Sequence, residues 1–194
     1  MEYINKMRKS YPFHPELIDM FRLKWGQDSR FQRTHGVLRL LASIVKDLWT
    51  RRGSLTGSQA LIHTSDINLS NLPTLTGTIT SLMGSQWETV IHADVIGTSS
   101  NAYKIDNEDP NNNISKYNLT QGIATTILMA SLGNLQNKGL TIEELKLCTL
   151  KPSAFNHSEV NSALSKLEQV AHYLYSTNVG SRSYWFQSKP NINI

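Results

Sequence analysis

The sequence predicts a mainly α-helical protein with one small β-hairpin near its C-terminus. Two patterns favour this fold class: apolar residues recur at three-and-four spacing along most of the chain, whereas residues 172–187 alternate as paired strands do. A polar run, NEDPNNNIS, interrupts the helical pattern and indicates an exposed connection. We therefore expect two domains, a helical one over residues 1–105 and a second over residues 106–194.

The composition is that of a globular protein whose charge is unevenly distributed. Of the 194 residues, 39% are apolar, which is enough for a proper core. Residues 1–52 hold 11 Lys and Arg against 5 Asp and Glu, although the net charge of the whole chain is only +4. This basic section suits nucleotide phosphates, nucleic acid or an acidic neighbouring domain, and charge alone does not distinguish these partners.

No segment has the pattern of a membrane anchor or a signal peptide. The apolar runs are shorter than the roughly 18 residues of a membrane span, and the N-terminal MEYINKMRKS lacks an apolar core. We therefore expect a cytoplasmic protein with no membrane partner. The single cysteine, Cys148, falls among apolar positions, so we expect it to be buried and free of disulfides.

The first two predicted helices are packing elements. Residues 2–9 have the pattern of the end of a helix, and in SYPFHPELIDMFRLKWG two prolines precede an apolar helical stripe that ends near Gly26. His14 lies between these prolines. No second ligand has a useful spacing from it, so we interpret His14 as a structural or exposed histidine rather than a metal ligand.

The stretch from Ser29 to Trp49 carries the clearest functional signal. Thr34 is a candidate N-cap for a helix. Seven apolar residues then recur at the spacing of one buried helical face: Val37, Leu38, Leu41, Ile44, Val45, Leu48 and Trp49.

Three arginines gather near the start of this helix. Gly36 and Arg39 form a G-x-x-R step, and Arg30 and Arg33 lie just before it. Cations at the positive end of a helix dipole are mildly unfavourable, so we look for an anionic partner. A solvated basic face is the alternative interpretation.

This stretch resembles the lid segment of AAA+-type P-loop ATPases. More narrowly, YPFHPELIDMFRLKWG followed by FQRTHGVLRLLASIVKDLW is similar to a large, mostly uncharacterised prokaryotic ATPase family, often encoded near DNA methyltransferases and phage-defence genes. The likeness extends to QWETVIHADVIG, QGIATTILMASLG and LTIEELKLCTLKP. It implies a lid-like helical domain in which Arg39 senses the nucleotide phosphates. Arg30 and Arg33 are weaker candidates for phosphate or intersubunit contacts.

The sequence departs from that family in lacking the motifs that bind and cleave ATP. It contains no G-x-x-x-x-G-K-[ST] loop, since GSLTGSQ has no lysine, and no apolar strand that ends in paired acids. We therefore expect a C-terminal fragment without catalytic residues, cofactor or metal. ATP and magnesium are expected for a larger parent, and the expected partners are its N-terminal ATPase core and other subunits of a defence complex.

The middle of the chain predicts short helices joined by capped turns. Asp66 and Ser70 are candidate caps, and apolar spacing predicts helices near 75–83 and 87–95. Asp94 lies on the apolar side of the second of these. We interpret it as a helix cap or an ion-pair partner of the basic section rather than a catalytic acid, because no partner for catalysis lies nearby in sequence.

The C-terminal pattern is three helices followed by a hairpin. Residues 119–132 form an apolar helix, Thr141 caps a second helix with Glu144, and Asn156 precedes a third over 157–170. The hairpin joins HYLYS to SYWFQ. This order predicts a winged helix, in which we expect the third helix to pack against the second.

A winged helix raises the alternative function of a nucleic-acid-binding module. The third helix would then enter the major groove and the hairpin would touch the backbone. The candidate contacts are Asn161, Ser162, Ser165, Lys166 and Arg182. With so few cations, binding to DNA would be weak and sensitive to salt, so we favour a role in protein contacts.

Overall fold

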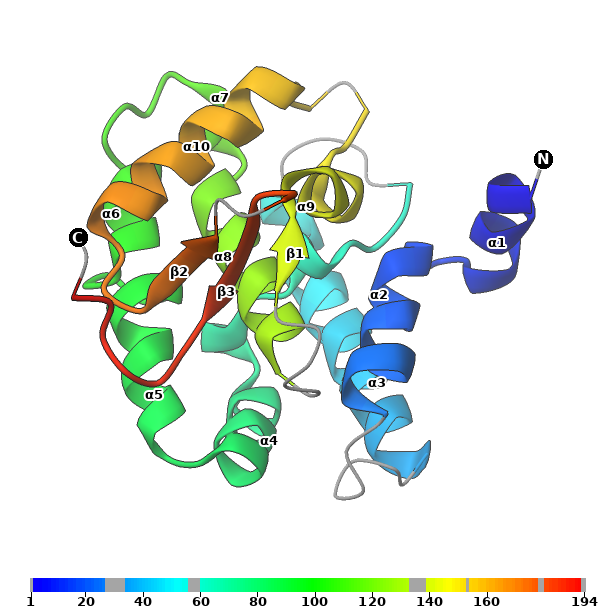
Figure 1. The fold of residues 1–194 in the computed structure, drawn as a ribbon. Coiled ribbons are helices and arrows are strands. Elements are labelled where there is room, and N and C mark those ends of the chain that lie inside the picture. The colour runs from blue at the N-terminus through cyan, green and yellow to red at the C-terminus, as the bar shows by residue number, and fades with distance from the viewer. Residues whose placement is uncertain are drawn as a thin grey trace.

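The computed structural model describes residues 2–26, 34–55, 60–132, 139–152, 154–177 and 180–192. It is mainly helical with one small three-stranded antiparallel sheet, as the sequence predicts (Figure 1). The strands lie in front of the long buried helix α8, and the remaining helices surround this centre (Figure 1). Within the described ranges, every helix is too short or too polar to cross a bilayer.

The N-terminal helices follow the predicted pattern. They are α1 (Glu2–Ser10), α2 (Pro15–Asp19), the π-helical η1 (Met20–Trp25) and α3 (Thr34–Thr50). Pro15 occupies the first turn of α2, and the His14 ring accepts a hydrogen bond from the Glu16 amide at 3.4 Å. His14 therefore begins this helix as its cap and is structural, as expected.

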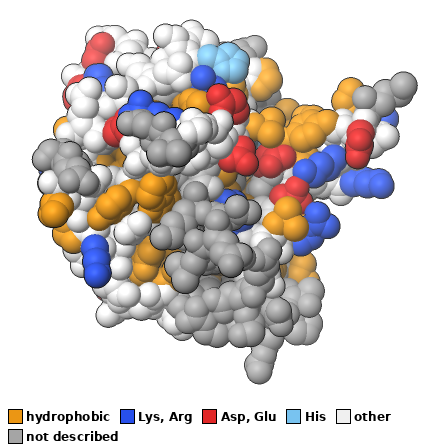
Figure 2. Space-filling view, viewed as in Figure 1, with side chains coloured by type: hydrophobic (Ala, Val, Ile, Leu, Met, Phe, Trp, Pro, Cys, Tyr) orange, Lys and Arg blue, Asp and Glu red, His pale blue; other side chains and the backbone are white. Residues whose placement is uncertain are grey.

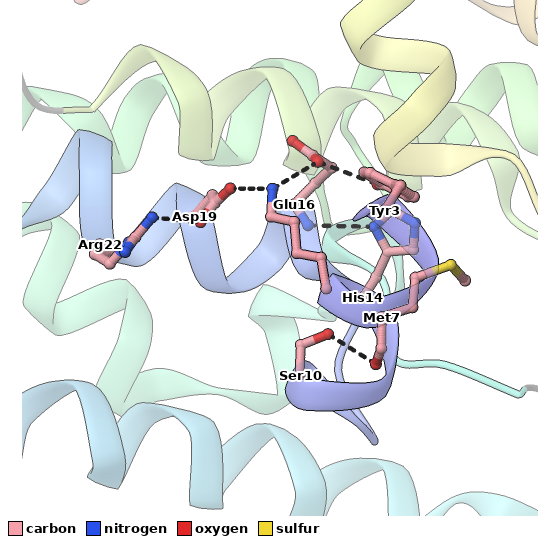
Figure 3. A network of polar contacts seen from close by, with 8 residues as sticks. Tyr3, Met7, Ser10, His14, Glu16, Asp19 and Arg22 are labelled. Carbon is pink, nitrogen blue, oxygen red and sulfur yellow. Dashed lines mark hydrogen bonds and ion pairs between the residues drawn. The ribbon is translucent and has the colours of Figure 1, made fainter. Parts of the chain in front are cut away.

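Helix α1 projects from the body of the molecule and has no buried residue (Figure 1). Polar contacts hold it to α2: the Tyr3 hydroxyl donates to Glu16 at 3.1 Å, and Lys6 forms ion pairs with Glu16 and Asp19 (Figure 3). Figure 2 shows basic and acidic side chains gathered on this arm. Charge rather than apolar packing therefore joins α1 to the rest.

Short helices make up the middle of the chain. They are η2 (Arg52–Ser54), η3 (Thr64–Asp66), η4 (Leu69–Asn71), α4 (Pro73–Met83), α5 (Gln86–Val90), η5 (Ile91–Val95), α6 (Asn101–Asp106) and α7 (Asn113–Lys116). Asp66 takes part in capping, although not as the N-cap: it is the last residue of η3, and its carboxylate accepts from the amide of the N-cap residue His63 at 2.8 Å. The cap at Ser70 is wrong: Asn68 caps η4 by accepting from the Ser70 amide, since the asparagine stands one residue before the helix.

The C-terminal elements are α8 (Leu119–Ser131), β1 (Leu140–Thr141), α9 (Ile142–Thr149), α10 (His157–Val170), β2 (Leu174–Thr177) and β3 (Ser183–Phe186). The predicted capping box of Thr141 with Glu144 is confirmed, as is the hairpin. Asn156, which we expected only to precede the third helix, forms a second capping box with Glu159. The sequence did not predict β1, which pairs antiparallel with β3 and gives the sheet order β1-β3-β2. Two residues are too few to show strand alternation.

Helix α8 is the centre of the packing. Almost all of its residues are buried, and it contacts η3, α6, α9, α10 and β3. The expected packing of residues 157–170 on 141–150 is not found: α10 lies on α8 and α6, and its direct contact with α9 is minor among the described residues. Both helices instead pack on α8.

The two predicted domains share one hydrophobic core. The Trp25 indole donates to the Met129 carbonyl in α8 at 3.0 Å. The buried Asp106 carboxylate at the end of α6 accepts from the amides of Thr120 and Gln121 at the start of α8. The predicted boundary between residues 105 and 106 therefore falls inside α6, and the separation into two domains stays a prediction.

Candidate functional site

Arg39 lies on the exposed side of α3. Leu40, Ile44 and Leu48 of α3 are buried in the core, and Val37 and Leu41 pack against it. The Arg39 side chain is exposed to solvent. No ion pair to Arg39 is found within the described residues. The expected orientation of this arginine is therefore confirmed.

The predicted buried face of α3 is too wide. Leu38, Val45 and Trp49 are 58%, 40% and 68% exposed, so one edge of the predicted apolar face is uncovered. Leu40, which the prediction left out of this face, is buried. The Arg52 guanidinium lies over the Trp49 ring at 4.5 Å. An apolar pattern shows which side chains favour burial, but the rest of this chain covers only the stripe centred on Ile44.

Two of the three predicted phosphate-contacting arginines cannot be placed. Arg30 and Arg33 lie outside the described residues, while α3 itself begins at Thr34. The prediction for this end of the helix therefore depends on Arg39.

The predicted nucleic-acid contacts lie on the outer face of α10 and on the hairpin. Asn161, Ser162 and Ser165 are exposed. The two cations are paired with acids: Lys166 with Glu108, and Arg182 with Glu168 at 2.6 Å. A DNA phosphate would have to displace a carboxylate at either position.

Asp94 is a structural acid in the buried junction between η5 and β2. It accepts hydrogen bonds from the amides of His172 and Tyr173, at 3.0 and 2.6 Å, and from the Asn101 side chain at 2.8 Å. We had expected Asp94 to cap a helix or to pair with the basic section. Among the described residues it does neither. The amides it binds lie two and three residues after the end of α10, although they are far from Asp94 in sequence.

The described residues enclose a polar pocket of about 380 Å³, which the sequence did not predict. It lies where the end of α3 meets η3, the start of α8 and the segment after α9. Its lining is Arg51, Ser54, Leu55, Ser65, Asp66, Ile67, Asn68, Ile96, Tyr103, Lys116, Tyr117, Asn118, Gln121, Gly122, Thr125 and Lys151. These residues come from segments far apart in sequence, and no motif joins them.

Two ion pairs organise the pocket wall. The Arg51 guanidinium donates from Nε to Asp47 at 2.7 Å and from Nη2 to the Asp66 carbonyl at 2.6 Å. Lys151 pairs with the Asp66 carboxylate, which is almost fully buried. Both cations are therefore held in place at the edge of the hollow.

Two buried histidines also lie together beside Cys148. His14 and His63 are stacked, and the His63 ring lies 3.2 Å from the Cys148 carbonyl oxygen. Burial raises the pKa of the Cys148 thiol to about 12, so the prediction of a buried cysteine is confirmed. No group of three or more potential metal ligands occurs in the described part of the chain.

Together these features define a mainly helical domain with a small antiparallel sheet, an exposed arginine on α3 and a polar pocket. The chain belongs to the family described as DUF499 second domain, which matches residues 1–186. No curated protein and no solved structure matches it.

Proposed function

We propose that this domain is a non-catalytic part of a larger AAA+-type P-loop ATPase, in which Arg39 senses nucleotide phosphates bound by another domain. The observation that carries the proposal is the position of Arg39: exposed, early in α3, and opposite the side that reaches the core. An arginine that folding does not use is free to contact a ligand from outside. Its planar fork suits phosphate oxygens.

We also propose that the C-terminal part is a winged-helix-like module that contacts a partner protein or the ATPase core. The order of its elements and the pairing of its strands favour this proposal, whereas the packing of α10 on α9 that we expected of a winged helix is not found. A helix, a short strand, two helices and a hairpin follow one another, and β1 adds to the hairpin through β3. The family description, a second domain, supports a role beside at least one further domain. The proposed partners are the N-terminal ATPase core and other subunits of a defence complex.

A DNA-binding role has less support. Phosphate neutralisation supplies much of the affinity for duplex DNA, and here Lys166 and Arg182 are already paired with Glu108 and Glu168. The free energy needed to break these ion pairs would offset much of the binding free energy that each phosphate contact contributes.

The test is a set of substitutions in the full-length protein that contains this domain. Arg39→Ala should lower ATP hydrolysis, and Arg39→Lys should restore it only in part because lysine lacks the bidentate fork. Lys46→Ala is the matched control: Lys46 is exposed on the same side of α3, about two turns further along. Equal activity of the Arg39→Ala and Lys46→Ala proteins would contradict the proposal.

A further inference from the structure

The solvent side of α3 carries a narrow line of apolar side chains. Leu38, Ala42, Val45 and Trp49 are all exposed, and they follow one another at intervals of four, three and four residues. This is the spacing of the a and d positions of a coiled coil, which keeps the four side chains in line along the helix. We call these four residues the outer stripe. It runs for about 16 Å, or three turns, outside the face of α3 that the core covers.

Trp49 is the most exposed member of the outer stripe, at 68%. The Arg52 guanidinium lies 4.5 Å from the centroid of its ring and donates to the Trp49 carbonyl at 2.7 Å. The guanidinium therefore restrains the ring at the surface before any partner arrives. Tryptophan and arginine are enriched among the residues that contribute most to binding at protein interfaces. Single exposed apolar side chains are ordinary, but a continuous line of them marks an interaction surface.

The charge around the outer stripe is positive. Arg39, Lys46 and Arg52 are exposed, and no ion pair with any of them is found in the described ranges. Asp47, the single acid in the sequence of α3, is paired with Arg51. A partner that covers the stripe therefore meets cations without a carboxylate of their own, which favours acidic side chains on that partner.

The charge and the width of the stripe argue against two other occupants. In a dimer formed through α3, a second copy of the chain would bring the same cations toward each other, and like charges across a helix interface are unfavourable. A membrane surface favours a helix with a wide apolar face, whereas the outer stripe has the width of a coiled-coil seam. A partner helix with acidic side chains fits both features.

We propose that the outer stripe docks an amphipathic helix of a partner protein. The apolar seam of that helix packs on Leu38, Val45 and Trp49, and acidic side chains beside the seam face the cations of α3. This docking goes beyond the role proposed for Arg39 in sensing nucleotide. It is tested on the isolated chain without nucleotide, so either proposal can fail without the other.

The experiment measures the binding of two designed helical peptides through the tryptophan fluorescence of the 194-residue chain. Both peptides lack tryptophan and have leucine at the a and d positions. One has glutamate at the e and g positions and the other has lysine, and these like charges also disfavour self-association. We expect the glutamate peptide to give a saturable shift of the Trp49 emission to shorter wavelength, because the exposed indole becomes buried. The lysine peptide should bind about tenfold more weakly or worse. The charge is varied in the peptide, so Arg39 and Lys46 stay unchanged.

Two substitutions locate the peptide on the stripe. Leu38→Ala should weaken binding of the glutamate peptide about fivefold through lost apolar contact. Leu147→Ala is the matched control, because Leu147 is an exposed leucine of α9, outside the stripe. Trp49→Phe should remove the fluorescence shift while calorimetry still detects binding. Leu38 and Trp49 are both exposed, so these variants should fold.

The proposal fails if the glutamate peptide gives no saturable shift, or if both peptides bind equally well. Equal affinities of the Leu38→Ala and Leu147→Ala chains would also overturn it, by placing the peptide elsewhere. A shift of the Trp49 emission on concentrating the chain alone, together with a dimer in sedimentation, would assign the stripe to a second copy. A shift with phosphatidylglycerol vesicles but not with the glutamate peptide would assign it to a membrane surface. Either of these results would overturn the proposal of a partner helix.

Discussion

His14 and His63 stack face to face in the interior, with ring centroids 4.4 Å apart and exposed fractions of only 6% and 5%. Backbone hydrogen bonds join the same two segments: the His14 amide donates to the Ile62 carbonyl, and the Ile62 amide donates to the Pro12 carbonyl, both at 2.8 Å. The pair thus fastens the start of α2 to the segment before η3. Protonation of either ring would place a charge inside this junction.

The stability of the chain should therefore fall in mild acid. Burial lowers the pKa of His14 to about 4, with smaller contributions from His63 and Lys6, and burial also lowers the pKa of His63. Between about pH 4 and the unfolded value near 6.5 the unfolded chain binds more protons, so the free energy of unfolding rises with pH. The stabilisation is complete above pH 6.5, and roughly 2 kcal/mol should be lost by pH 4.

Urea unfolding at pH 7.5, 6, 5 and 4 measures this loss. Carboxylates also titrate at the acidic end, so the informative quantity is the difference between the native chain and His14→Asn. Asparagine keeps a side-chain acceptor for the Glu16 amide but does not titrate. The same pH slope in both proteins would show that the histidine pair does not control acid stability.

The face of α3 that is buried in the structure predicts that alanine substitutions at neighbouring positions destabilise the chain to different extents. Ile44 is 1% exposed and Val45 is 40% exposed. Ile44→Ala should cost about 2 to 4 kcal/mol through lost burial and a residual cavity, and Val45→Ala less than about 1 kcal/mol. Comparable losses in thermal or urea unfolding would mean that the outer stripe is also covered.

Gly139 should be the least replaceable glycine of the sheet. Its φ is +79°, and a Cβ there would overlap the Tyr184 carbonyl on β3. Gly139→Ala should therefore destabilise the chain by about 2 to 4 kcal/mol. Gly180→Ala provides the control, because Gly180 has a similar φ of +74° but open space at the Cβ, and it should cost only about 1 kcal/mol.

Duplex DNA should bind weakly at most. Band shifts of the isolated chain at rising salt should show no stable complex near physiological ionic strength, because Lys166 and Arg182 are already paired. A complex that persists at that salt concentration and is lost in Arg182→Gln would instead support the nucleic-acid alternative.

Local signals in the sequence predict most of the fold. The third C-terminal helix begins and ends at residues 157 and 170 as predicted. Its start is marked by the capping box of Asn156 and Glu159, which a short sequence window contains. The alternation of residues that predicts the two hairpin strands is equally clear in the sequence. These features depend on neighbours a few residues away, so they are visible without any knowledge of tertiary structure.

The parts that the sequence does not predict depend on distant contacts. Strand β1 exists only because Leu140 pairs with Tyr184, and the histidine stack joins residues 14 and 63. The pocket wall depends on the contacts that Arg51 and Lys151 make with Asp66. The apolar pattern of α3 likewise could not show that Trp49 stays exposed, because burial depends on what packs against a helix.

The most direct test of the account is the affinity of the full-length protein for Mg-ATP and for adenosine, each measured with Arg39 and with Arg39→Ala. A sensor arginine contacts phosphates only, so the substitution should weaken Mg-ATP binding about tenfold or more and leave adenosine binding unchanged. The isolated Arg39→Ala chain should keep its unfolding free energy within about 1 kcal/mol, because this side chain is exposed. Unchanged Mg-ATP affinity, or an equal loss for adenosine, would contradict the role proposed for Arg39.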